Sequence, residues 1–248
     1  MGVLPARAGR PRPHRSAAGS LVNSRAYVAE FLGSAGLAAV VVGSGIAAQT
    51  LSPTDVGLAL FENAFATALG LGVLIAVFAS VSGAHFNPAV SLVDAATGGR
   101  SWRSVAVYIP VQIIGCLGGA ALANAMFGVP TAFSTTDRAT WPHLLAEVVA
   151  TFGLVLVIFA LVRTGRGNLA APAVGAYIGA AYFFTSSTSF ANPAITVGRA
   201  ISDTFAGIAP ASVLPFIAAQ LVGAAIAWLA VRMLYPVREP EAAIPAEV

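Results

Sequence analysis

Six stretches of this chain are each long and apolar enough to cross a lipid bilayer. They cover approximately residues 26–48, 57–81, 104–127, 142–162, 169–188 and 212–234. An α-helix needs about 20 apolar residues to span roughly 30 Å of hydrocarbon. The pattern therefore predicts an all-α membrane protein with six transmembrane helices.

Composition supports a membrane protein and excludes several soluble classes. Charged residues make up 9% of the 248 residues and hydrophobic residues 57%, whereas soluble domains carry about 25% charged residues. Many of the arginines lie in flanks and loops rather than in one nucleic-acid-binding stripe. Cys116 is the single cysteine, which excludes an internal disulfide and a cysteine-based metal cluster. We expect neither metal nor cofactor.

The two ends of the chain differ from its apolar middle. Residues 1–24 contain four arginines and three prolines, and no apolar run followed by a cleavage site. This composition predicts a disordered basic tail rather than a signal peptide. Residues 236–248 are predicted to be a second disordered tail, which leaves 25–235 as the membrane domain.

The two halves of this domain repeat each other. Three features occur twice in the same order, at offsets of 117, 105 and 108 residues. They are Ala29–Gly33 with Ala146–Ala150, Asn87–Val90 with Asn192–Ile195, and Gln112–Gly115 with Gln220–Gly223. Such spacing indicates duplication, with repeats at about 25–127 and 141–235. Because three helices separate the copies, the second repeat must be inverted in the membrane.

Two short segments between apolar spans contain the tripeptides Asn87-Pro88-Ala89 and Asn192-Pro193-Ala194. Asn is a preferred N-cap, and Pro is favoured at the first helical position. Gly98-Gly99 is expected to stop the first helix after about eleven residues, or roughly 16 Å, about half the hydrocarbon thickness. Each motif therefore predicts a half-helix.

The two half-helices are expected to meet at the membrane midplane, around a cavity. Irregular backbone at that depth is tolerated where it is buried in protein or lines a water-filled space. With the side-chain oxygens of Asn87 and Asn192 capping their helices, both amide NH₂ groups should be free to donate into that space. Each helix N-terminus carries about half a positive charge, which repels cations.

At this point the sequence resembles the aquaporin and aquaglyceroporin (major intrinsic protein) superfamily, over about Arg25 to Tyr235. The segment Ser82-Gly83-Ala84-His85-Phe86-Asn87-Pro88-Ala89-Val90 is close to that family's first signature. The resemblance implies a right-handed bundle of six helices with two re-entrant half-helices. It also implies a homotetramer with one passive pore in each subunit.

Buried polar residues recur in both repeats. Glu30 and Glu147 lie inside apolar spans, where an ionised carboxylate costs roughly 2.5 to 3.5 kcal/mol on insertion scales. They are expected either to accept hydrogen bonds from half-helix or loop N–H groups or to relay protons, and the resemblance favours the first role. Gln112 and Gln220 are expected to satisfy loop backbone or to pack between helices.

The resemblance also implies a selectivity filter, at positions counted from the motifs. These positions are Thr67, Ala180, Ser189 and Ile195. Water-selective members typically have Phe, His and Arg among them, and glycerol-conducting members keep the Arg. The filter expected here has no aromatic ring and no charge, so solutes bulkier than water should fit. His85 is placed by the resemblance in the cytoplasmic vestibule, or else is a structural histidine.

The second motif sharpens the resemblance to bacterial aquaglyceroporin-like channels linked to arsenic resistance. The segments 192–199 and 202–208 carry this likeness, because those relatives also have an aliphatic residue in place of the filter Arg. The expected solutes are undissociated metalloid acids such as arsenous acid, with glycerol or water. The alternatives are an ordinary water or glycerol facilitator, or a closed structural membrane protein. An intramembrane enzyme is not supported, because no nucleophile and base converge.

Arg199 lies four residues after Ile195 and therefore one turn further along the same helical face. It is expected either to guard the external vestibule against cations or to anchor headgroups or loop carbonyls. The repeat-related residue is Asp94, so the two mouths are expected to carry opposite charges.

Arginine placement predicts that both termini are cytoplasmic. Eleven of the thirteen arginines fall on one side if six helices alternate, and Arg138 and Arg199 fall on the other. The positive-inside rule makes the arginine-rich side cytoplasmic. A reporter fused after Tyr235 should be active in the cytoplasm. Activity on the outer side alone would refute the six-helix assignment.

Overall fold

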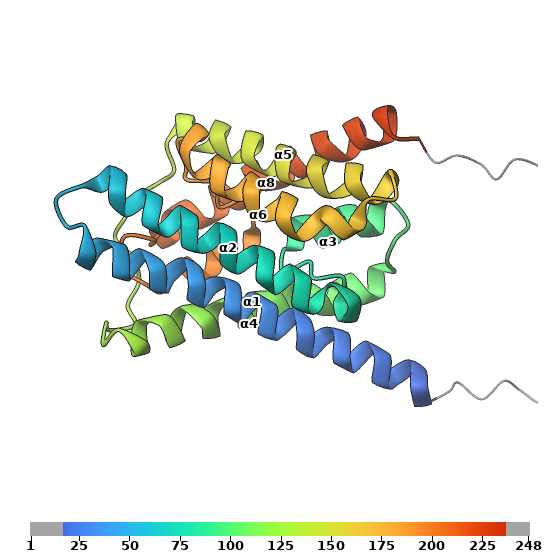
Figure 1. The fold of residues 1–248 in the computed structure, drawn as a ribbon, viewed down its shortest axis with the longest axis horizontal. Helices are drawn as coiled ribbons and strands as arrows, with labels where there is room; N and C mark the ends of the chain where they lie inside the picture. Colours follow the sequence, from blue (N-terminus) through green and yellow to red (C-terminus); the bar gives the residue numbers. More distant parts are fainter. Residues whose placement is uncertain (1–16, 237–248) are drawn as a thin grey trace, which may run out of the picture.

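The computed structural model describes residues 17–236, with side chains described from Ser24 onward. Within that part every regular element is helical. The α-helices are α1 (Ala17–Leu51), α2 (Val56–Ser82), α3 (Pro88–Ala96), α4 (Trp102–Met126), α5 (Trp141–Arg163), α6 (Ala170–Phe184), α7 (Pro193–Arg199) and α8 (Pro210–Leu234). A 3₁₀ turn, η1 (Gly167–Leu169), precedes α6. The predicted all-α fold is confirmed, and Figure 1 shows the long helices packed side by side in one bundle.

Five helices of the described chain are long and apolar enough to cross a membrane: residues 24–51 of α1, and all of α2, α4, α5 and α8. The chain is therefore a multi-pass membrane protein. The remaining long element, α6, has 15 residues and ends at Phe184, whereas the sequence predicted a span to residue 188. The run of Ser and Thr from Thr185 to Ser189 explains the early end, because hydroxyl side chains compete for backbone groups.

Helix α1 begins at Ala17, so residues 17–24 belong to a helix and not to the tail that was expected. Alanine and leucine are strong helix formers, and this segment contains both. Residues 1–16 and 237–248 lie outside the described residues.

The first half-helix is shorter than the roughly eleven residues that the glycine pair predicted, and the second is shorter still. Helix α3 has nine residues and α7 has seven. Helix α3 ends at Ala96, two residues before Gly98, which has a φ of +83° that suits glycine. Each begins at the proline of its motif, with the preceding asparagine as N-cap.

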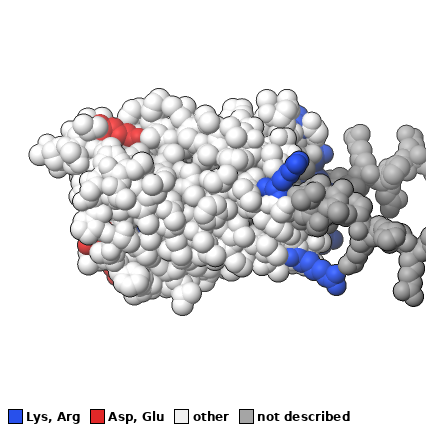
Figure 2. Space-filling view, turned by 90° about the horizontal axis from the view of Figure 1, so that it is seen from below, with Lys and Arg blue, Asp and Glu red and all other residues white. Residues whose placement is uncertain are grey.

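Charge is sorted along the long axis of the bundle. In Figure 1 both described ends of the chain leave at the same end, and Figure 2 shows arginine side chains there and acidic side chains at the opposite end. This agrees with the arginine pattern of the sequence. Which end faces the cytoplasm stays a prediction.

Glycines let two repeat-related helix pairs, α1 with α4 and α5 with α8, approach closely. A methyl group added to Gly119 of α4 would lie 2.0 Å from the carbonyl oxygen of Ala35 in α1. One added to Gly223 of α8 would lie 2.3 Å from the carbonyl oxygen of Val148 in α5. Small residues at such crossings allow the backbone contact on which helix packing in membranes depends.

The neighbouring Gly118 is exposed, with no heavy atom within 4 Å of an added methyl group. We expect Gly119→Val to destabilise the protein by about 2 kcal/mol or more, because overpacking forces the backbones apart. Gly118→Val, the matched control on the same helix, should change stability far less. Thermal unfolding of both variants in detergent would test this, and equal melting temperatures would contradict the close crossing.

Candidate functional site

The two motif loops meet and brace each other through their asparagines. Asn87 donates from Nδ2 to the carbonyl oxygen of Ala191 at 2.7 Å, and Asn192 donates from Nδ2 to that of Phe86 at 2.8 Å. Each Oδ1 accepts the N–H two residues later, at 2.9 Å in both halves. An amide NH₂ has two hydrogens, so each asparagine keeps one donor and not the two that were expected.

Glu30 of α1 holds the first loop from behind. Its Oε1 accepts hydrogen bonds from Ser82 Oγ at 2.7 Å and from the N–H of His85 at 2.9 Å. Its Oε2 accepts from the N–H of Phe86 at 2.8 Å and from Gln112 Nε2 at 2.7 Å. Glu30 is fully buried, and these four donors compensate its charge.

Glu147 of α5 repeats this arrangement in the second half. Its Oε1 accepts from Ser187 Oγ at 2.7 Å and from the N–H of Phe190 at 2.9 Å. Its Oε2 accepts from the N–H of Ala191 at 2.9 Å and from Gln220 Nε2 at 2.6 Å. Each glutamate thus accepts from a serine hydroxyl, a glutamine amide and two backbone N–H groups of its loop. Such bonding indicates a structural acceptor.

Gln112 and Gln220 reach hydroxyl groups and not the loop backbone that the sequence suggested. Besides the glutamates, Gln112 Nε2 donates to Ser91 Oγ at 3.0 Å, and Gln220 Nε2 donates to Thr196 Oγ1 at 2.8 Å. Both hydroxyls lie in the half-helices and bond in turn to the carbonyl oxygen of the capping asparagine. The glutamines therefore join each glutamate to its half-helix.

The loops are held in an unusual backbone conformation. Ala84 and Phe86 have φ of 50° and 47°, and their repeat-related residues Ser189 and Ala191 have φ of 52° and 46°. Such values cost of order 1–3 kcal/mol for a residue with a side chain and persist where surrounding bonds enforce them. Here the N–H groups of Phe86 and Ala191 are fixed by the two carboxylates.

A cavity of about 60 Å³ runs past the paired asparagines. Since one water molecule needs about 10–15 Å³ of such space, the cavity has room for a few water molecules. Aliphatic side chains form much of the wall: Leu37, Val41, Leu71, Ile75, Leu154, Ile158, Val174, Ile178 and Ile195. Polar side chains also line it: Thr67, Tyr182, His85, Asn87, Ser189, Asn192 and Arg199.

Three of the four predicted filter residues line this cavity, and Ala180 does not. Ala180 is exposed on the outer face of α6, because the buried positions of that helix include Ile178, Ala181 and Tyr182. Tyr182 of the same helix lines the cavity where Ala180 was expected, and its hydroxyl lies 3.2 Å from Thr67 Oγ1. The sequence count missed Tyr182, although its spacing of four from Ile178 could have revealed it.

The cavity also contains an aromatic and charged pair, so the expectation of a filter with no aromatic ring and no charge is wrong. Arg199 is only 2% exposed and lines the cavity, with its Cζ 3.4 Å from the centroid of the Phe190 ring. Its Nε donates to the carbonyl oxygen of Ala206. Sequence reasoning missed Phe190, whose one signal was its place two residues before Asn192, matching His85 in the first half.

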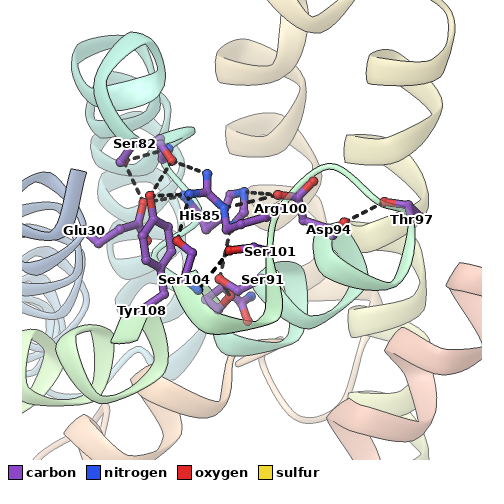
Figure 3. Close-up of polar contacts among 12 residues, drawn as sticks. Glu30, Ser82, His85, Ser91, Asp94, Thr97, Arg100, Ser101, Ser104 and Tyr108 are labelled. Carbon is purple, nitrogen blue, oxygen red and sulfur yellow. Dashed lines mark hydrogen bonds and ion pairs between the residues drawn. The ribbon is translucent and has the colours of Figure 1, made fainter. Parts of the chain in front are cut away.

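His85 lies at the other end of the cavity within the polar network of Figure 3. Its Nδ1 lies 3.0 Å from Ser91 Oγ, and its Nε2 lies 3.5 Å from Asp94 Oδ2. Arg100 Nε lies 3.3 Å from the same carboxylate oxygen. Because Arg100 neutralises Asp94, the expectation of opposite charges at the two mouths fails at this end.

Arg100 ties this network to the bundle. It donates to the carbonyl oxygen of Ser82 at 2.7 Å and to the Tyr108 hydroxyl at 2.8 Å. Tyr108 donates to the same Ser82 carbonyl at 2.9 Å. The sequence did not indicate Arg100 or Tyr108, because nothing in their spacing from the motif marks them.

Comparisons with known proteins agree with this geometry. The sequence profile of the Major intrinsic protein family matches residues 17–190. The chain is 46% identical over 218 residues to Aquaglyceroporin AqpS of Rhizobium meliloti, covering 87% of this chain and 92% of that protein. It is 30% identical over 261 residues to the Glycerol uptake facilitator protein of Pseudomonas aeruginosa, covering 89% and 92%.

Among solved structures, the aquaglyceroporin from Plasmodium falciparum superposes with a TM-score of 0.65. The match covers 84% of this chain and 95% of that one at 19% sequence identity. At this identity the likeness concerns the fold alone.

The buried glutamates yield a stability prediction. We expect Glu30→Gln and Glu147→Gln each to destabilise the protein by about 3 kcal/mol or more. In each variant an NH₂ group replaces one carboxylate oxygen, so the donors that this oxygen accepted lose their acceptor and face another donor. Glu62→Gln is the control, since Glu62 accepts from a single donor among the residues that the structure describes, Ser52 Oγ at 2.9 Å. Thermal unfolding in detergent would measure all three, and equal losses would contradict the structural role.

Proposed function

The chain belongs to the major intrinsic protein family of passive membrane channels, and on that premise we propose that it conducts small neutral solutes bearing several hydroxyl groups. Glycerol and undissociated metalloid acids such as arsenous acid are the proposed solutes, with water. The protein is a channel and not an enzyme.

The observation that carries this proposal is that both aliphatic and hydrogen-bonding side chains line the cavity. Aliphatic side chains such as Leu71 and Ile178 can cover the carbon or metalloid side of a solute. Asn87 and Asn192 each keep one N–H to donate, and the hydroxyl oxygen of Ser189 is buried without a hydrogen-bond partner in the described part of the chain. A solute with several hydroxyl groups can replace its water contacts at these groups one after another, which favours passage.

Ile195 supports metalloid acids, because it lines the cavity where glycerol-conducting relatives carry the filter arginine. The narrow cavity and Tyr182 support the alternative, an ordinary water or glycerol facilitator. Flux of arsenous acid, glycerol and water into proteoliposomes separates the two. Arsenous acid entry near or above glycerol entry supports metalloid transport, and its exclusion with rapid glycerol entry supports the facilitator.

We further propose a homotetramer in the bacterial inner membrane with both termini cytoplasmic. The family resemblance supports the assembly, and the sorting of arginines to one end of the bundle supports the orientation.

A cysteine scan tests whether this cavity is the conduction path. Ser189 lines the cavity, and Ser186 is exposed outside it. We expect a mercurial to lower glycerol flux through Ser189→Cys about tenfold, with recovery in reductant, because a bulky adduct would fill a cavity of about 60 Å³. Ser186→Cys and the parent chain should change little. Equal inhibition of all three would mean that the effect arises elsewhere, for example at Cys116.

A further inference from the structure

The second half of the molecule places two arginines against one aromatic ring. Arg199 comes from α7, and Arg138 comes from the connection between α4 and α5. Their Cζ atoms lie 3.4 Å and 5.4 Å from the centroid of Phe190. A guanidinium over a ring face is stabilised by the negative charge of that face. Phe190 therefore lies against both cations, at the end of the cavity away from His85, which is the outer end in the proposed orientation.

The same two arginines bind three consecutive carbonyl groups of one loop. Arg138 donates from Nε to Gly207 at 2.7 Å and from Nη2 to Phe205 at 3.2 Å. Arg199 donates from Nε to Ala206, which lies between them. Because Arg138 fixes the residues on either side of Ala206, it also fixes the acceptor that orients Arg199.

The carboxylates near this pair, Asp137, Asp203 and the buried Glu147, are all bonded to other groups. Asp137 accepts hydrogen bonds from Ser212 Oγ at 2.6 Å and from the N–H of Ala139 at 3.0 Å. Asp203 accepts from the N–H and hydroxyl of Thr135 at 2.9 Å and 3.1 Å. Among the described residues, neither arginine has a carboxylate oxygen within ion-pair distance. The outer end of the cavity therefore keeps a positive charge.

Comparison of the two repeats shows what is particular to the outer end. In both halves the residue seven after the asparagine lies beside the ring of the residue two before it: Asp94 beside His85, and Arg199 beside Phe190. At the inner end Arg100 neutralises the charge of Asp94. At the outer end the third residue is another cation, Arg138.

We propose that Arg138 and Phe190 are positioning residues that hold the Arg199 guanidinium in the cavity wall and thereby set the discrimination of this channel against cations. This inference rests on the proposed conduction of neutral solutes through the same cavity. Arg199 Nη1 and Nη2 have no hydrogen-bond partner among the described residues and belong to a side chain that lines the cavity. The Arg199 guanidinium, in a space of low dielectric, repels an entering cation much more strongly than it would in water.

The test compares Arg138→Gln with Arg166→Gln in proteoliposomes. Arg166 is exposed at the opposite end of the bundle, and its Nε bonds to the Thr164 hydroxyl at 3.1 Å. Proton and potassium leak would be followed with a pH-sensitive dye and a potential-sensitive dye, and glycerol flux by light scattering. We expect Arg138→Gln to raise cation leak by roughly tenfold while glycerol flux stays within about threefold. Arg166→Gln should behave as the parent chain.

Two further variants separate positioning from a general structural role. Arg138→Lys keeps the charge but loses the fork that binds two carbonyls, so its leak should fall between those of the parent and Arg138→Gln. Phe190→Leu removes the ring and should raise leak in the same direction. Unchanged cation leak in folded Arg138→Gln and Phe190→Leu proteins would overturn the proposal. Absence of glycerol, arsenous acid and water flux in the parent chain would instead refute the proposed function.

Discussion

The fold depends on keeping two stretches of non-helical backbone at membrane depth without leaving their N–H groups unsatisfied. In a bilayer each unsatisfied group costs several kcal/mol, because no water can compensate it. Glu30 and Glu147 meet this need, each accepting two backbone N–H groups and two side-chain donors. These two glutamates, which are costly inside a membrane helix, thus stabilise the loops that carry the half-helices and enclose the cavity.

The two repeats share a scaffold and differ where the scaffold meets the cavity. Glutamate, glutamine, a half-helix hydroxyl and the capping asparagine form the same chain of hydrogen bonds in both halves. The residues two before each asparagine differ, histidine in one half and phenylalanine in the other. An inverted duplication can therefore keep its framework while each mouth acquires its own chemistry.

Much of this architecture could be predicted from local rules. The apolar spans, the capped half-helices and the matched glutamates follow from length, capping chemistry and burial cost. Ala180 shows where such reasoning stops. The position of Ala180 was counted along the chain from Asn192. However, α6 ends at Phe184, and packing sets the rotation of this helix so that Tyr182 faces the cavity. Likewise Arg138 and Arg199 are 61 residues apart in the sequence, and only the folded loops bring them to one ring.

Hydrogen exchange in lipid nanodiscs tests the central claim most directly. The amides of His85, Phe86, Phe190 and Ala191 lie in loops, yet all four donate to buried carboxylates. They should exchange at least roughly a hundredfold more slowly than the amides of the exposed segment 131–133, because their exposure requires the network to open. Exchange of all four as fast as in that segment would show that the carboxylates do not hold the loops.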